Sequence, residues 1–547
     1  MAAIDLYSGI GGWTTGFRMA GINVVASYEW WKDANNTHNK NFGTTHSEVN
    51  IRELQLEDLP NPDEIEFVLG SPPCTQFSYA NRGGNGDIAD GMIDIFKFLE
   101  VVEYLNPRYW AMENVPRVAK IIEREIQEGG SLFRFRNLFS ENGIRVYDSS
   151  DFGVPQKRKR MIAGRLPFDL LESYKEITPR LTMGDVLEAL NQNLVVDPIY
   201  GFELNKEDVT DHIAEAPLSD EEARINGDSK AYHAVYNTMN FPDRWDRPSR
   251  TITALCTRVS RESIIIEDHH KNLRRLTVRE RGCLQSFPLN YQFYSGSYGG
   301  KLKMIGNAIP PVLTFYIAQS MLERNAKEVL LPNQVNNPIV VADEPPVVHS
   351  PDDRGAKYSW SRSFWLAIPG LRFGSGVRFE LRNYHDKRDK STSWKMNFFF
   401  GNSKNIKAKE LDLEIFERSS LILKELNDPS LDSLINEFIA YSEAINIEGL
   451  QKNWTNKDRS RLGPIELIDD IGRFSDRFKR ILKKKKLTER VLLVFIEDEL
   501  RNGNGRVDNK KLSDNPIDVF VGMLIGSCFN TIMSGKKVQQ ELMLVAE

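Results

Sequence analysis

The sequence predicts an α/β protein built on a mostly parallel sheet with helices on both faces, followed by an additional α+β unit. Short apolar runs typical of buried strands alternate with amphipathic helical stretches such as Ile93–Tyr104. Polar and glycine-rich segments directly follow these runs, and ligands of such sheets bind beyond the carboxyl ends of the strands. The predicted strands are Ile4–Tyr7, Val24–Tyr28, Phe67–Leu69, Tyr109–Met112 and Met161–Ala163.

The composition is that of an ordinary globular protein, since 41% of the 547 residues are hydrophobic and 27% are charged. No apolar run approaches the roughly 18–20 residues of a membrane helix, and the first residues lack the features of a signal peptide. We therefore expect a cytoplasmic protein with no membrane association. The net charge of −5 indicates that any nucleic-acid-binding surface is local. The four cysteines show neither a disulfide framework nor zinc-ligand spacing, so no metal site is expected.

Changes in pattern along the chain predict its domain organisation. The regular alternation covers residues 1–169, an irregular polar region follows over 170–265, and helical patterning returns over 266–330. Prolines spaced through 331–354 are typical of a linker. Residues 355–547 form a further unit that begins with strand-like runs and continues into helices.

A glycine-rich turn over residues 5–12 follows the first predicted strand. Glycine lets the backbone turn tightly and approach a ligand closely, while the next helix offers its amide end. About 20 residues further on, Glu29 follows the second strand, where dinucleotide folds place an acceptor for a ribose diol. Trp30 is placed to cover an adenine ring. A plain tight turn explains the glycines equally well.

Cys74 follows the third predicted strand, within the run Ser71-Pro72-Pro73-Cys74. A lone cysteine is ordinarily a small buried hydrophobic residue. Here two prolines fix the path of the loop and remove two amide donors, which makes a stiff mount for a thiol at the edge of the sheet. The pattern favours a positioned nucleophile.

Two further polar groups accompany the fourth and fifth predicted strands. Glu113 ends a largely apolar strand, where poor solvation favours a general acid, although a surface carboxylate that caps a loop is the alternative. Arg158 and Arg160 share one parity before the run Met161–Ala163, so both can point into the same cleft, whereas charge runs more often form a solvated face. A late Gly306–Pro311 run opens a helix and is also compatible with a simple turn.

Taken in order, these runs resemble the motifs of bacterial cytosine-5 DNA methyltransferases over about residues 3–323. A further match to that family is the run that ends in Gln285-Ser286-Phe287-Pro288. The resemblance implies a Rossmann-like S-adenosylmethionine methyltransferase sheet with a small irregular target-recognition domain over 170–265. It also implies that Cys74 is the nucleophile, Glu113 the acid and Arg160 a contact to the base, with Arg158 in support. The implied cofactor residues are Tyr7, Gly9, Gly11, Glu29, Trp30, Asn50, Ile51 and Asn307. Tyr7 stands where the family usually has phenylalanine, which keeps the aromatic face.

By this resemblance the chain methylates carbon 5 of a flipped cytosine in double-stranded DNA, possible partners being restriction or phage-defence proteins. A tRNA substrate and a non-enzymatic reader of cytosine are the alternatives. Residues 355–547 match nothing in the family, and a fused restriction nuclease is less favoured there than an accessory DNA-binding or protein-docking domain. The strongest basic run is Lys483–Lys486. Candidate phosphate or guanine contacts are Arg258, Arg261, Lys271, Arg274 and Arg275, each of which is more simply a solvated surface charge.

Overall fold

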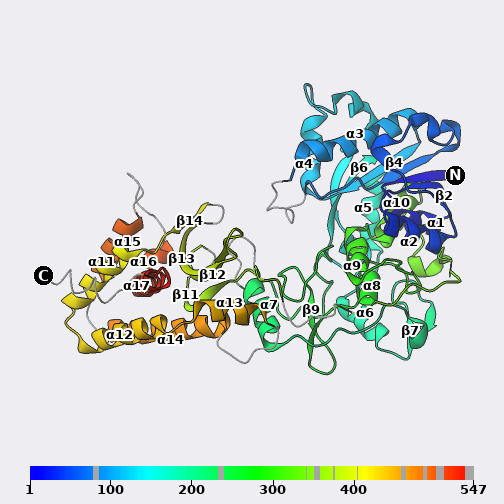
Figure 1. Cartoon of the computed structure of the whole chain (residues 1–547). Helices are drawn as coiled ribbons and strands as arrows, with labels where there is room; N and C mark the ends of the chain where they lie inside the picture. Colours follow the sequence, from blue (N-terminus) through cyan, green and yellow to red (C-terminus); the bar gives the residue numbers. More distant parts are fainter. Residues whose placement is uncertain are drawn as a thin grey trace. The chain divides into compact units, whose positions relative to one another are not determined.

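In the computed structural model the chain divides into two compact units (Figure 1). The first comprises Met1–Asn226 with Asn240–Asp352, and the second comprises Gly227–Met239 with Asp353–Glu547. The structure describes residues 1–77, 86–231, 239–340, 342–349, 351, 358–373, 376–402, 405–456, 463–484, 489–500 and 510–535. Lys485 and Lys486 of the predicted basic run lie outside the described residues.

A six-stranded sheet forms the centre of the first unit, in the order β2-β1-β3-β4-β6-β5. Its strands β1 to β4 pair in parallel, whereas β6 is antiparallel to both β4 and β5. The mostly parallel α/β fold is therefore confirmed. The strands are β1 (Ala2–Leu6), β2 (Asn23–Tyr28), β3 (Phe67–Gly70), β4 (Tyr109–Asn114), β5 (Ile144–Asp148) and β6 (Lys159–Arg165).

Helices cover both faces of this sheet (Figure 1). On one face α1 (Gly12–Met19) packs closely on α10 (Pro311–Met321), because a Cβ on Gly16 would lie 2.1 Å from Thr314 Oγ1. The other face is covered by α3 (Ile88–Leu105) and α4 (Arg117–Glu125). Each layer buries a continuous apolar core, so the strand ends are held at a fixed edge.

Shorter elements complete the first unit and form a third apolar core around Phe287 and Tyr291. Between residues 170 and 265 the described elements are short and are joined by long connections. The elements are α2 (Lys32–Phe42), α5 (Phe168–Ser173), α6 (Met183–Leu190), β7 (Leu194–Val196), β8 (Glu203–Asn205), α7 (Asp220–Ala231), β9 (Ile265–Glu267), β10 (Leu273–Arg275), α8 (Val278–Leu284) and α9 (Tyr298–Asn307).

The second unit contains an antiparallel sheet in the order β11-β12-β13-β14, with helices packed on one face. The packing is close, since a Cβ on Gly522 would lie 2.4 Å from the ring of Phe379. The elements are β11 (Trp365–Arg372), β12 (Arg378–His385), β13 (Thr392–Asn402), β14 (Asn405–Lys409), α11 (Leu413–Glu425), α12 (Pro429–Glu443), α13 (Ile447–Thr455), α14 (Pro464–Lys484), α15 (Glu489–Leu500), α16 (Lys510–Ser513) and α17 (Pro516–Met533).

Helix α17 is, within the described part of the chain, long and apolar enough by length and composition to cross a membrane. The expectation that no segment reaches this length was wrong. The helix is 72% buried inside the second unit, where it packs on β13, α11 and α14. This burial is that of a core helix, and a single such segment is weak evidence for a membrane span.

Candidate active site

A cavity of about 310 Å³ lies at the edge of the first unit's sheet, where β1, β2, β3 and β4 end. All four residues predicted to carry the chemistry line it, namely Cys74, Glu113, Arg158 and Arg160. Most of the residues predicted to hold the cofactor line the same cavity: Tyr7, Gly9, Glu29, Trp30 and Asn307. Residues far apart in the sequence therefore meet at one edge, as expected for parallel strands.

The reversed direction of β6 explains why Arg160 reaches this edge. In the antiparallel pairing with β4, Asn114 lies opposite Met161 and Glu113 lies opposite Ile162. The first residues of β6 therefore lie beside the last residues of β4. A parallel strand would have carried Arg160 to the opposite edge of the sheet.

Glu113 and Arg160 form an ion pair in which Arg160 Nε lies 2.7 Å from Glu113 Oε1. The two side chains keep 8% and 12% of their exposure, and both face the cavity. The sequence argument expected a poorly solvated carboxylate but did not anticipate a positively charged partner. A base that enters the cavity therefore meets a hydrogen-bonded pair rather than a lone carboxyl group.

Hydrogen bonds hold the loop that carries Cys74 at two points before the cysteine. Asn114 Nδ2 donates to the carbonyl oxygen of Pro72 at 3.1 Å, and Trp13 Nε1 donates to Ser71 Oγ at 3.0 Å. Burial raises the pKa of the Cys74 thiol, and Glu113 acts in the same direction, while Arg160 and Arg158 oppose them. The thiol is thus held protonated at neutral pH in the free protein.

Arg158 differs from Arg160 in what it contacts. Its side chain is buried, and its guanidinium donates to the carbonyl oxygens of Ile252, Gly306 and Ala308 at 2.8–3.0 Å. Gly306 is required at this point, because a Cβ there would lie 2.4 Å from the backbone nitrogen of Ala254. Arg158 therefore fastens the loops around the cavity that it also lines.

The glycine-rich turn connects to Glu29 through the backbone. Gly9 and Gly11 have φ values of +56° and +82°, in the left-handed region that favours glycine. The Gly9 amide donates to Glu29 Oε2 at 2.8 Å, and the Trp31 amide donates to Glu29 Oε1 at 2.7 Å. Gly11 does not line the cavity, and its role is to shape the turn in front of α1.

A second cavity of about 320 Å³ adjoins the first and shares Tyr7, Glu29, Trp30, Pro73 and Thr75 with it. Asn50 and Ile51 line this second cavity, as does the exposed Trp30, which keeps 67% of its surface. The Asn50 side chain caps the short helix Ile51–Glu53 and donates to Glu53. Two adjoining cavities with an aromatic ring and a carboxylate at their junction suit an elongated ligand.

Sequence reasoning missed a charged network beside the second cavity. Arg52 pairs with Asp90 at 2.8 Å and with Asp94 at 2.7 Å, and the Tyr7 hydroxyl donates to Asp94 at 3.3 Å. Lys303, which lies over the Trp31 ring at 4.7 Å, also lines the first cavity. Apart from Tyr7, none of these residues belongs to a motif, so only the three-dimensional structure reveals them.

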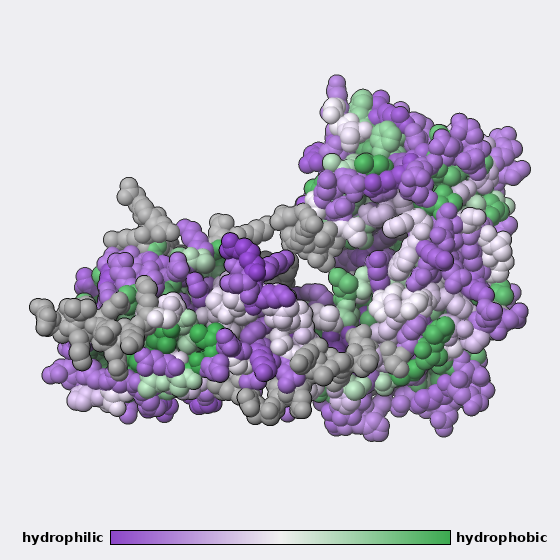
Figure 2. Space-filling view, viewed as in Figure 1, coloured by the Kyte–Doolittle hydropathy of each residue, from purple (hydrophilic) through white to green (hydrophobic). Residues whose placement is uncertain are grey.

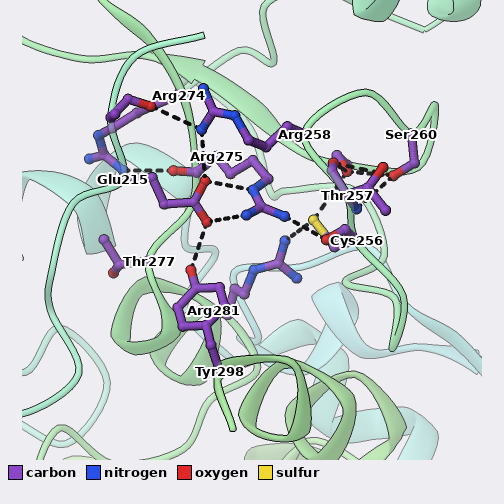
Figure 3. Close-up of polar contacts among 12 residues, drawn as sticks. Glu215, Cys256, Thr257, Arg258, Ser260, Arg274, Arg275, Thr277, Arg281 and Tyr298 are labelled. Atoms are coloured by element: carbon purple, nitrogen blue, oxygen red, sulfur yellow. Dashed lines mark hydrogen bonds and ion pairs between the residues drawn. The ribbon is translucent and has the colours of Figure 1, made fainter. Parts of the chain in front are cut away.

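A second charged cluster in the first unit surrounds Glu215 (Figure 3). Arg275 Nη2 lies 2.6 Å from Glu215 Oε1, and both side chains are 1% exposed. Tyr298 donates to the same carboxylate at 2.7 Å, and Arg258 Nη1 lies 3.2 Å from it.

Three of the arginines predicted as candidate DNA contacts are engaged in ion pairs within the protein. Arg275 and Arg258 are used in internal ion pairs, and Arg274 pairs with Glu280 at 2.7 Å. Of the predicted set, Lys271 remains largely exposed, at 82% of its side-chain surface. Within the described residues no group of His, Cys, Asp and Glu side chains is arranged to hold a metal ion.

The fold and this edge define a class, the methyltransferases that act on cytosine. The chain belongs to the C-5 cytosine-specific DNA methylase family, which matches residues 1–323. It is 29% identical over 358 residues to the Type II methyltransferase M1.HphI of Haemophilus parahaemolyticus, covering 59% of this chain and 87% of that protein. It is 27% identical over 351 residues to M.FnuDI of Fusobacterium nucleatum, covering 59% and 94%.

Solved structures of similar proteins cover the same part of the chain. A putative DNA modification methyltransferase encoded in an Escherichia coli prophage aligns with a TM-score of 0.42 at 20% identity, over 59% of this chain and all of that one. The Dnmt2 methyltransferase of Schizosaccharomyces pombe aligns with a TM-score of 0.39 at 18% identity, over 59% and 98%.

The protein is thus a DNA cytosine-5 methyltransferase that uses S-adenosylmethionine as its methyl donor. The residues present fit that donor. The buried Glu29 carboxylate can accept hydrogen bonds from a ribose diol, and the exposed Trp30 ring offers a stacking face at the junction of the two cavities. Cys74 lines the first cavity, whereas Asn50 and Ile51 line the second.

Proposed function

We propose that the chain methylates carbon 5 of a cytosine flipped out of duplex DNA, through a transient covalent bond between that base and Cys74. The observation that carries this proposal is the meeting of Cys74, Glu113 and Arg160 in one cavity. A stacked base cannot enter such a cavity, so the cytosine must leave the helix at a cost of a few kcal/mol.

The chemistry explains why a thiol is needed. Carbon 5 of cytosine is a weak nucleophile, and addition of the Cys74 sulfur to carbon 6 makes it enamine-like. When bound, S-adenosylmethionine supplies the electrophilic methyl group. Loss of the proton from carbon 5 then restores the double bond and breaks the bond between sulfur and carbon 6. Because the pKa of Cys74 is raised in the free protein, the thiol must give up its proton to solvent as its sulfur adds to carbon 6. The carbon 5 proton likewise passes to solvent when the bond between sulfur and carbon 6 breaks.

The neighbouring charges have separate roles in this proposal. Glu113 hydrogen-bonds or protonates ring nitrogen 3 of the cytosine, which offsets the charge that develops as sulfur adds. Arg160 orients Glu113 through their 2.7 Å contact and stabilises the carbonyl oxygen of the base. Arg158 positions the surrounding loops through its three carbonyl contacts.

The methyl donor spans both cavities in this proposal. Glu29 accepts from its ribose, Trp30 covers its adenine, and Asn50 and Ile51 contact the far side of that ring. Tyr7, Gly9, Gly11 and Asn307 shape the walls of the first cavity and the turn that leads into it.

The biological setting follows from the same assignment. Residues 170–265 read the DNA target, and the protein acts in the cytoplasm. Several relatives are named Type II methyltransferases, which supports a role in restriction-modification with a restriction or phage-defence partner protein. Residues 355–547 serve as an accessory domain.

Methyl transfer to duplex DNA from a radiolabelled donor tests the mechanism. Cys74→Ser should reduce transfer below detection, whereas the matched variant Cys256→Ser, at another half-buried cysteine, should retain it. DNA that contains 5-fluorocytosine should form a covalent adduct with the unaltered protein and none with Cys74→Ser. Undiminished transfer by Cys74→Ser would overturn the mechanism, and preferential methylation of tRNA would overturn the substrate.

A further inference from the structure

The sheet of the second unit has one face covered by helices and an opposite face, called the open face, that is exposed at Trp365, Tyr384 and Lys395 but buried at Arg378 and Glu380. Alternate residues along each strand point to opposite faces. Phe379, Leu381 and Met396 are buried on the covered face. On the open face Trp365 lies opposite Arg382, which in turn lies opposite Lys395, so the three form a row across β11, β12 and β13.

The open face displays aromatic rings that a sheet would normally bury. Trp365 keeps 46% of its surface and Tyr384, two residues beyond Arg382 on β12, keeps 43%. Lys395 is exposed, and the Arg382 side chain is 32% exposed. We call Trp365, Arg382, Tyr384 and Lys395 the platform. Exposed aromatic residues grouped on one face mark interaction sites more often than scattered ones do.

The sheet is also strongly basic, in contrast with the whole chain. On the face that carries Trp365, the charged residues of the strands are Arg372, Arg378, Arg382 and Lys395 against the single carboxylate Glu380, whereas the net charge of the chain is −5. Glu380 is the single carboxylate within the four strands, and it pairs with both Arg378 and Arg382. Figure 2 shows hydrophilic residues around β14 on the viewed side of this unit, beside paler and apolar patches. A basic face complements a polyanion.

Phe399 completes the open face beneath the two arginines. The guanidinium carbons of Arg378 and Arg382 lie 4.7 and 4.5 Å from the centre of its ring. These stacking contacts and the bonds to Glu380 hold the Arg382 side chain in place. The basic group is therefore ordered before any ligand arrives, which lowers the entropic cost of binding.

We propose that the platform binds single-stranded DNA, with bases stacked on Trp365 and Tyr384 and phosphates held by Lys395 and Arg382. A major groove about 12 Å wide admits a helix or a two-stranded ribbon, but four strands spaced about 4.8 Å apart are too wide for it. Unpaired bases can instead lie flat against aromatic side chains on an open sheet. DNA is favoured over RNA because the same chain carries a DNA methylase unit. The binding is separate from methyl transfer and does not depend on it.

Fluorescence anisotropy with the full-length protein and a labelled oligothymidine of about 20 nucleotides tests this proposal. The unaltered protein should bind it more tightly than oligouridine. Trp365→Ala combined with Tyr384→Ala should weaken binding by about tenfold or more, and Trp365→Phe should retain most of it. Lys395→Ala should reduce the slope of log affinity against log salt by about 0.7.

The matched control is Tyr104→Ala, which removes a ring that is 40% exposed on α3 of the first unit and should leave binding unchanged. If the double variant does not fold, as judged by circular dichroism, the charge reversal Lys395→Glu at an exposed position takes its place. Unchanged affinity for oligothymidine in these platform variants would overturn the proposal, as would tighter binding of oligouridine.

Discussion

Two Glu–Arg pairs in the first unit have nearly the same length and very different surroundings. Arg160 lies 2.7 Å from Glu113, and Arg275 lies 2.6 Å from Glu215. The first pair faces a cavity and keeps 8–12% of its exposure. The second is 1% exposed and receives two more partners, Tyr298 and Arg258.

The difference shows that the location of a Glu–Arg pair, rather than the pair itself, decides whether it has a chemical or a structural role. The Glu215 carboxylate is already bonded to Arg275, Tyr298 and Arg258 inside the protein, so its role is to hold segments together. Glu113 lies at the carboxyl end of a strand and faces a space large enough for a ligand. Asp5 is a third case, since it is buried without an arginine partner and accepts from Thr14 at 2.8 Å.

The largest effect is expected for Glu113→Gln. The amide cannot donate a proton as an acid does, so methylation should fall by about 10²–10⁴-fold. Initial rates on duplex DNA measure this loss, while calorimetry should show that S-adenosylmethionine still binds. A loss smaller than tenfold would mean that the Glu113–Arg160 pair has a structural role, as the Glu215–Arg275 pair has.

Glu215→Gln should act on stability rather than chemistry. Removing the carboxylate leaves Arg275 buried without its counter-charge, which costs about 3 kcal/mol or more in the free energy of unfolding. Urea denaturation measures it. The matched control Glu267→Gln breaks an exposed pair with Lys271 and should change stability by no more than about 0.5 kcal/mol. Equal effects of the two substitutions would contradict the role given to the enclosed pair.

Asp5, the buried carboxyl group without an arginine partner, should make the stability of the protein depend on pH. Burial raises its pKa from 3.8 to about 7, so the folded state binds more protons than the unfolded state between these values. Stability therefore declines as pH rises through this window and levels off above pH 7. His38, on the other side of Thr14, stays neutral because burial lowers its pKa to about 3.

Asp5→Asn should remove this decline, because the amide does not titrate. Relative to the unaltered protein, the variant should gain about 2–3 kcal/mol in unfolding free energy between pH 5 and pH 8. Denaturant titrations of both proteins at the two pH values measure the change. A difference that stays constant with pH would show that Asp5 is not held protonated by its surroundings.

Much of the first unit's sheet follows from the sequence because its inner strands are continuous apolar runs. Strands β1 to β4 and β6 were predicted within a few residues. The edge strand β5 was missed because Ile144–Asp148 is only partly buried and shows no clear alternation. In the second unit the sequence predicted strand-like runs followed by helices, and the structure has β11 to β14 before α11, with β11 interrupted by a proline and a glycine.

The candidate site was predictable to the extent that strand ends define it. Cys74, Glu113 and Arg160 follow or precede apolar runs, so topology alone brings them together. The alternation of side chains along β6 could not reveal that Arg158 donates to three carbonyl groups. These groups lie on loops about 90–150 positions away in the sequence. Likewise, Arg275 looked like a surface charge because its partner Glu215 is 60 positions distant.

The contacts of Pro155–Arg158 also bear on how such a protein can change its target. Lys157 N donates to Ser249 O at 2.8 Å and Ser249 N donates to Pro155 O at 3.0 Å, while Arg158 holds Ile252. The intervening segment thus departs from and returns to a single point beside the catalytic edge. A segment anchored in this way can change length at modest entropic cost. We therefore propose that the outer part of this segment can be replaced while its anchoring contacts beside the cavity stay in place.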